Sequence, residues 1–333
     1  AREAGYAIRG IQKASEEDRC DSEEIGIGGN PQVRDALQGG EILLTAGTAW
    51  LWSREDMMGS VDVLFIDEAG QFSLANALAV SPAAESLVLL GDPRQLEQPQ
   101  RGVHPPGADV SALDHLLAGE ATVGGDRGLF LPETWRLHPD ITDFTSEMFY
   151  RGRLHSRDGL DKQVVGEGGA VSGAGLRWIP AEHAGNQNQS DEEVALVTSL
   201  VRDLLEAAPS WTDRDGAVRT LGLSDILVVA PYNAQVSALA GALREGARVG
   251  TVDKFQGQES PVVIYSMTSS SAEDAPRGMD FLYSANRLNV ATSRAMCLVV
   301  VVGTAALFGP ECKSPKQMRM ANAFCRLKEM VRP

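Results

Sequence analysis

Two adjacent carboxylates follow a run of β-prone apolar residues in the segment "VDVLFIDEAGQ". Asp67 and Glu68 come directly after residues 61–66, which predict a buried parallel strand. Ligands of parallel sheets bind beyond the carboxyl ends of the strands. Asp67 could therefore hold Mg²⁺, and Glu68 could orient or deprotonate an attacking water, as phosphoryl transfer requires. The alternative is that the two acids merely open a helix, whose dipole favours them.

A second predicted strand also ends in polar residues, in the segment "SLVLLGDPRQL". Gly-Asp-Pro makes a tight turn by itself, which is the structural alternative. Asp92 and Gln95 nevertheless follow the strand closely, and Gln95 could sense the γ-phosphate of a nucleotide. Two strand ends that both carry such groups indicate a nucleotide site more strongly than one does.

Two arginines occupy positions from which they could neutralise charge on a phosphoryl group. Arg136 lies in "ETWRLHP", where Pro139 is well placed to begin a helix, and Arg294 immediately precedes the apolar run "AMCLVVVVG". Arginine fingers of this kind raise phosphoryl-transfer rates by several orders of magnitude. Each arginine taken alone is more simply a structural residue.

The elements that must position these residues alternate between strands and helices. Six short apolar runs predict buried parallel strands: "EILLTA", "VDVLFI", "SLVLL", "DILVVA", "PVVIYSM" and "CLVVVVG". Helices are predicted at 191–208, where Ser190 and Glu193 form a capping box, and at 233–244. This rhythm is typical of an α/β fold with mostly parallel sheets, here in two lobes that divide near residues 124–128.

Composition sets wide limits on function. An apolar fraction of 43% and a charged fraction of 23% are ordinary for a globular protein, and no apolar run approaches the ~20 residues of a membrane span. The four cysteines form no C-x-x-C pair, so we expect inert thiols and a cytoplasmic protein. A net charge of −15 disfavours non-specific nucleic-acid binding, although a locally basic groove remains compatible with it.

Taken together, five stretches resemble the motifs of superfamily 1 helicases. In order, they are motif II (Asp67, Glu68), III (91–95), IV (Trp135, Arg136), V (251–259) and VI (289–294). The segments "DEAGQ", "GDPRQL" and "VDKFQGQE" are similar to the motifs of the helicase branch that moves 5′ to 3′, which includes the nonsense-decay and end-resection helicases. The greatest likeness is to the helicase half of bacterial RecB-like nuclease–helicase fusion proteins, and it covers nearly the whole chain.

The resemblance implies a role for each matching residue. Asp67 would coordinate Mg²⁺, Glu68 would activate water, Gln95 would report the γ-phosphate state, and Arg136 and Arg294 would contact the γ-phosphate. The nucleotide would also meet a second set: Asp92, Gln256, Gly257 and Glu259, the last near the ribose. Four further residues would contact a single strand: Thr48, Tyr232, Asn233 and Thr251. Tyr232 and Thr251 could equally be packing residues.

The family's P-loop, G-x-x-x-x-G-K-[ST], does not occur in this sequence. Six of the 30 basic residues are lysines, and none of the six follows Gly and precedes Ser or Thr. We therefore expect an N-terminally truncated motor, with 1–126 forming a partial first RecA-like lobe and 127–333 the second. Such a chain would hold ATP poorly, and the sheet of its first lobe would expose an unpaired flank.

The resemblance therefore predicts an ATP-dependent DNA helicase or translocase that uses ATP and Mg²⁺, inactive alone without its P-loop. Its expected partners are single-stranded DNA, or RNA, and the upstream P-loop and nuclease segments of a parent chain, with no membrane. The alternatives are a nucleic-acid-binding or assembly module whose ATPase is lost, and an RNA helicase. The intact acids and arginines disfavour a lost ATPase.

Overall fold

A computed structural model describes residues 5, 8–15, 17, 20–40, 42–98, 104–105 and 107–331. The chain divides into two compact units. Unit 1 comprises Ala1–Pro93 and Glu97–Gly119, and unit 2 comprises Arg94–Leu96 and Glu120–Pro333. The division after Gly119 falls slightly earlier than the predicted boundary at 126, and the identity of the units as motor lobes stays a prediction.

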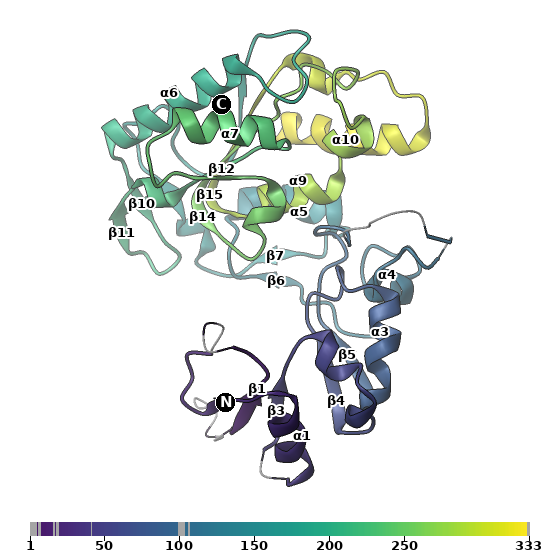
Figure 1. Cartoon of the computed structure of the whole chain (residues 1–333). Coiled ribbons are helices and arrows are strands. Elements are labelled where there is room, and N and C mark those ends of the chain that lie inside the picture. The colour runs from purple at the N-terminus through teal and green to yellow at the C-terminus, as the bar shows by residue number, and fades with distance from the viewer. Residues whose placement is uncertain are drawn as a thin grey trace. The chain divides into compact units, whose positions relative to one another are not determined.

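Among its described residues, unit 1 contains two small parallel sheets and four α-helices, which Figure 1 shows. Its strands are β1 (Gly10–Gln12), β2 (Ile25–Ile27), β3 (Leu44–Ala46), β4 (Val61–Ile66) and β5 (Ala84–Leu89). Its helices are α1 (Asn30–Gln38), α2 (Ala49–Trp52), α3 (Leu74–Val80) and α4 (Ala112–Leu117). One sheet has the order β2-β1-β3, and the other pairs β4 with β5.

One face of the β4–β5 sheet is packed and the other is open. Leu64 and Ile66 of β4 are buried in the core of unit 1, whereas Val63 and Phe65 between them are 42% and 62% exposed. In a sheet that is covered on both faces, residues of this kind are buried. Among the described residues, the β4–β5 sheet therefore has one incompletely covered face, and the predicted unpaired flank of a partial lobe stays a prediction.

Unit 2 contains a larger sheet with helices on both faces. Its strands are β6 (Glu133–Thr134), β7 (His155–Ser156), β8 (Val164–Val165), β9 (Gly175–Pro180), β10 (Ser210–Thr212), β11 (Val218–Thr220), β12 (Ile226–Val229), β13 (Arg248–Gly250), β14 (Ser260–Ser266) and β15 (Ala295–Gly303). Its α-helices are α5 (Pro139–Phe149), α6 (Asp191–Ala207), α7 (Asn233–Ala242), α8 (Met279–Leu282), α9 (Ala285–Thr292) and α10 (Pro315–Met330). Short 3₁₀ turns connect several elements, among them η7 (Val252–Phe255).

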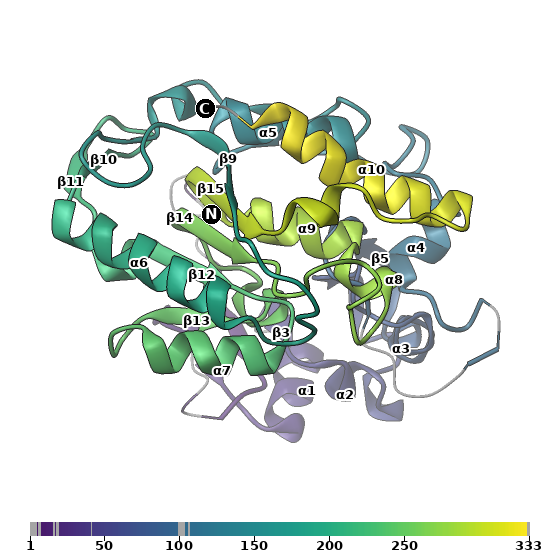
Figure 2. The ribbon, with the colours of Figure 1, turned by 90° about the horizontal axis from the view of Figure 1, so that it is seen from above.

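The central sheet of unit 2 has five parallel strands in the order β13-β12-β14-β15-β9. Alternate residues of its strands point to opposite faces and enter two separate cores. Figure 2 shows α6 and α7 on one face and α5, α9 and α10 on the other. The predicted α/β class with mostly parallel sheets is confirmed, and all six predicted strands are present.

The start of α6 differs in one detail from the predicted capping box. The Ser190 side chain accepts a hydrogen bond from the backbone N–H of Glu193, as predicted. The Glu193 carboxyl group does not return the bond, because it is buried and binds Ser266 and Thr268 instead. The backbone N–H of Ser190 donates to Gln235 of α7. The capping box is therefore half formed, and its second half is replaced by tertiary contacts.

Candidate active site and strand interface

The two acids lie at the carboxyl end of β4 and are exposed to solvent. The Asp67 carboxylate accepts a hydrogen bond of 2.9 Å from the backbone N–H of Glu68. Glu68 has a left-handed backbone with φ of 51°, a conformation that is uncommon outside glycine and concentrates at functional sites. No helix begins here, since α3 starts only at Leu74 with Ser73 as its N-cap. The alternative in which the acids open a helix is therefore excluded.

The loops after β4 and β5 approach each other backbone to backbone. The N–H of Ala69 donates to the carbonyl of Leu90 at 2.8 Å. A Cβ atom at Gly70 would lie 2.7 Å from the Asp92 carbonyl oxygen, and one at Gly91 would lie 2.8 Å from the Ala69 nitrogen. Both positions therefore require glycine, which places Asp92 beside the loop that carries the acids. These contacts all lie within unit 1.

A second cluster in unit 2 contains both predicted arginines. The Arg294 guanidinium is buried, at 2% exposure, and donates to the Gln95 side-chain oxygen at 3.3 Å. Arg136 donates to the Glu259 carboxylate at 2.7 Å and to the backbone carbonyl of Ser293 at 3.2 Å. Residues that lie far apart in the sequence thus form one group of charged and polar side chains, in which Arg136 and Glu259 neutralise each other.

The turn before β14 completes this cluster. The backbone carbonyl of Gln258 accepts a bond of 3.4 Å from Arg294, and its side chain accepts one of 3.0 Å from Arg248. Gly257 has a positive φ of 78°. Gln256 and Gly257 lie in the same turn, which follows η7. Because Glu259 and Arg294 directly precede β14 and β15, the cluster lies at the amino ends of these parallel strands.

Three of the four residues predicted to contact single-stranded nucleic acid lie at the carboxyl ends of the β-strands in the same sheet, opposite the arginine cluster. Tyr232, Asn233 and Thr251 follow β12 and β13, and they line a cavity of about 470 Å³. Asn233 is exposed, but the Tyr232 ring is only 6% exposed and packs against Phe281, with ring centroids 5.4 Å apart. Burial also raises the pKa of the Tyr232 hydroxyl. The packing alternative for Tyr232 is therefore favoured over stacking on a base.

The fourth predicted contact, Thr48, lies in unit 1 at the N-cap of α2 and is exposed. The sequence analysis missed three residues that line the cavity with the predicted ones: Arg277, Phe281 and Arg287. The sequence did offer one signal for Arg277: it precedes a glycine in the polar segment 269–280, close to Phe281.

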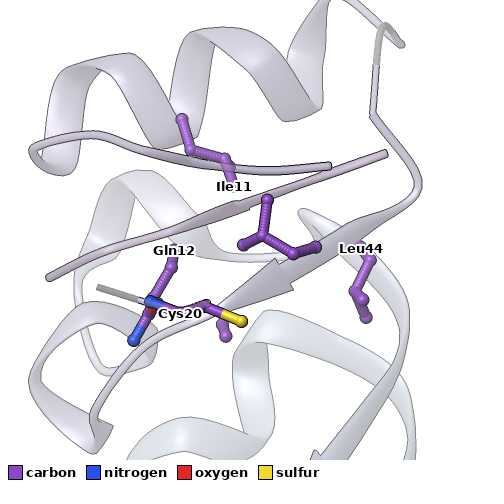
Figure 3. Close-up of a pocket in the computed structure, with 6 residues that line it drawn as sticks. Ile11, Gln12, Cys20 and Leu44 are labelled. Atoms are coloured by element: carbon purple, nitrogen blue, oxygen red, sulfur yellow. The ribbon is translucent and has the colours of Figure 1, made fainter. Parts of the chain in front are cut away.

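A second cavity, in unit 1, differs in character from the first. It has a volume of about 270 Å³ and is lined mainly by apolar side chains of β1, β2 and β3 (Figure 3). Gln12 contributes an amide, whose oxygen accepts the backbone N–H of Cys20 at 3.1 Å. Figure 3 shows Ile11, Gln12, Cys20 and Leu44 around it. None of the described residues that line it carries a charged side chain.

A divalent cation is compatible with the carboxylate at the tip of β4. In the described part of the chain no group of three His, Cys, Asp or Glu residues could hold a metal ion, which excludes an all-protein cage there. Mg²⁺ commonly uses only one or two carboxylates, and takes its remaining ligands from water and substrate phosphates. The exposed Asp67 carboxylate fits that pattern. No helix among the described residues is long and apolar enough to cross a membrane.

Comparison with known proteins assigns the family. The model of the family described as "AAA domain" matches residues 109–306, more than half of the chain. The chain belongs to this family. The matched region contains Arg136, Glu259 and Arg294, whereas Asp67 and Glu68 precede it.

Two curated relatives are named as helicases, and a third, from Homo sapiens, is named as a 3'-5' exoribonuclease and is 29% identical over 278 residues, which cover 71% of this chain and 9% of that protein. Helicase sen1 of Schizosaccharomyces pombe is 27% identical over 258 residues, which cover 72% of this chain and 14% of that protein. The DNA polymerase alpha-associated DNA helicase A of the same organism is 27% identical over 264 residues, covering 73% of this chain and 37% of that protein. The resemblance to superfamily 1 helicases is thereby confirmed, and the chain spans less than half the length of each of these two relatives.

Solved structures show weaker likeness. The complex of arterivirus nonstructural protein 10, a helicase, with DNA matches 90% of this chain and 49% of its own, at 15% identity and a TM-score of 0.45. The family match and the sequence relatives, rather than this likeness, assign the chain to its class.

Proposed function

We propose that the chain is part of an ATP-driven motor of superfamily 1 that moves along single-stranded nucleic acid, with DNA as its substrate. The main support is the cluster in unit 2, where Arg294 binds Gln95 and Arg136 binds Glu259. A buried guanidinium bonded to a glutamine can change partner when a phosphate arrives, because the phosphate is the stronger acceptor. Gln95 would then be released from Arg294 when a nucleotide binds.

The acids of unit 1 supply the complementary half of this chemistry. Asp67 would hold Mg²⁺, which neutralises charge on the β- and γ-phosphates when bound. Glu68 would orient the attacking water and accept its proton. The close contact of the Gly70 and Gly91 backbones keeps Asp92 beside these acids. Gln256, Gly257 and Glu259 would meet the nucleotide from unit 2, and Glu259 would have to leave Arg136 to do so.

The absence of a P-loop motif supports a proposal about the phosphate cradle. No lysine of the chain lies in a G-K-[ST] context, and Val63 and Phe65 of β4 are exposed. We propose that a P-loop segment of the parent protein completes unit 1, as in RecB-like nuclease–helicase fusion proteins. On this proposal the chain alone hydrolyses ATP poorly or not at all.

A cytoplasmic location and a role in DNA repair are part of the same proposal, supported by the unpaired cysteines and the resemblance to end-resection helicases. An RNA motor is the second candidate. Among curated relatives, the name of the polymerase alpha-associated protein specifies DNA. Discrimination between DNA and RNA would depend on contacts to the 2′-hydroxyl.

The first experiment measures ATP turnover by this chain and by a longer parent form, each with and without single-stranded DNA or RNA. We expect turnover only in the parent form, stimulated by DNA and removed by Glu68→Gln. Glu85→Gln, which alters an exposed glutamate of β5, is the matched control and should leave turnover unchanged. Turnover by the 333-residue chain itself would contradict the missing cradle. An inactive parent would favour a binding module whose ATPase is lost.

A further inference from the structure

The cavity at the carboxyl ends of β12 and β13 contains two arginines that share one aromatic ring. The guanidinium carbon of Arg277 lies 3.8 Å from the Phe281 ring centroid, and that of Arg287 lies 4.4 Å from it. Both arginines and the phenylalanine line the cavity. Stacking on an aromatic face fixes the plane of a guanidinium while its N–H donors remain available at the edge.

The two arginines differ in whether their charge is compensated. Arg287 donates to the Asp253 carboxylate at 2.9 Å and is only 20% exposed. Arg277 is exposed, and no carboxylate in the described part of the chain lies within ion-pair distance of it. In a protein with a net charge of −15, an uncompensated guanidinium that is held in place at a cavity indicates a binding group for an anion.

The other polar groups of the cavity specify the kind of anion. Asn188, Asn233 and Thr251 line it with side chains that can donate to phosphate or sugar oxygens. One fixed cation and several neutral donors can bind a backbone phosphate of single-stranded nucleic acid whatever the base sequence. A motor that moves along the strand requires such sequence-independent contacts.

We propose that Arg277, presented by the ring of Phe281, binds a backbone phosphate of the single strand in this cavity. The inference rests on the proposed function and assigns a contact that the sequence motifs do not include. Arg287, in contrast, is held by Asp253. Phe281 is a positioning residue, since it acts through Arg277.

The test compares Arg277→Ala with Arg219→Ala in the binding of a fluorescent oligothymidylate by the full 333-residue chain, at several salt concentrations. Arg219 is a matched control, because it is exposed and lies over the Trp211 ring but is paired with Asp213. We expect Arg277→Ala to weaken binding about tenfold and to lower the slope of log Kd against log salt by about 0.7, the value for one phosphate of a single strand. Arg219→Ala should change neither quantity.

Phe281→Leu tests the presentation of the arginine. It should weaken binding less than Arg277→Ala does, and the slope of log Kd against log salt should lie between those of the wild type and Arg277→Ala. An unchanged affinity would overturn the role of the ring. Unchanged binding by Arg277→Ala, with a wild type that binds, would overturn the inference alone. A wild type that binds no strand would overturn the proposed function as well. Displacement of the strand by millimolar inorganic phosphate would indicate a small-anion site instead.

Discussion

At the scale of single residues, the proposed function requires both site arginines to exchange their partners. Arg136 and Arg294 are both occupied by protein acceptors, Glu259 and Gln95. Their positions fit a nucleotide site, yet each must break a hydrogen bond before it can bind a phosphate. The resemblance to helicases identified these residues by type, but their proximity depends on the fold, in which the sheet order β12-β14-β15 places Glu259 and Arg294 at the adjacent starts of β14 and β15.

Removal of the Glu193 side chain should lower the free energy of unfolding of unit 2, because this side chain forms buried hydrogen bonds. Its carboxyl group is fully buried and accepts from the Ser266 hydroxyl at 2.5 Å and from the Thr268 N–H at 2.9 Å, and it lies 3.0 Å from the His183 ring. Glu193→Ala would remove the buried acceptor of these groups, although Ser266 keeps its bond from Gln235 and His183 its bond to Ser270, at a cost of about 3 kcal/mol. Urea unfolding of the variant should show a correspondingly lower midpoint.

Glu206→Ala, at an exposed position near the end of the same helix, is the control for helix propensity. It should change the free energy of unfolding by no more than about 0.5 kcal/mol, as is usual for surface positions. Equal effects of the two substitutions would show that the buried network contributes nothing beyond the helix itself.

At the scale of elements, regular structure was more predictable than irregular structure. The six apolar runs all form strands, and α6 ends at Ala207, one residue before the predicted end. The edge strands β9 and β13 were not predicted, because "GLRWIP" carries no apolar run and β13 has only three residues. The predicted helix at 233–244 ends earlier, at Ala242, since Leu243 already has an extended backbone.

The candidate site was predicted in its residues but not in its geometry. Local sequence places Asp67, Arg136 and Arg294 beside strands or helices, because each adjoins a strong apolar run or a proline. Local sequence cannot show that the predicted nucleic-acid contacts lie at the carboxyl ends of the β-strands and the two arginines at the amino ends of the same sheet. Arg277 was missed for a related reason: its significance comes from Phe281 and from the missing carboxylate among the described residues, which only the fold reveals.

The junction between the loops after β4 and β5 allows a sharp test at this scale. Gly70→Ala would place a Cβ 2.7 Å from the Asp92 carbonyl, so one of the two loops must move. We expect destabilisation by about 2 kcal/mol, as for other overpacked sites. In the active parent form, ATP turnover should fall with it. Gly26→Ala is the control in unit 1, since its nearest contact is 3.8 Å away, and it should leave turnover intact.

At the scale of the whole molecule, the two units should differ in stability. Unit 2 buries both faces of its central sheet, and every residue of β14 is buried. Unit 1 leaves Val63 and Phe65 of β4 and Leu87 of β5 exposed on small sheets. Burial of apolar area supplies most of the favourable free energy of folding, so unit 1 should open more readily than unit 2.

Hydrogen exchange with mass spectrometric detection measures this difference directly. Amides of β4 and β5 should exchange at least ten times faster than those of β14 and β15, because local opening requires less free energy where less apolar surface is buried. In a parent form that supplies the P-loop segment, protection of β4 and β5 should rise while that of β14 stays constant. Equal protection of the two units in the 333-residue chain would contradict the difference in stability. A parent form that leaves β4 unprotected would show that the missing cradle does not cover this sheet.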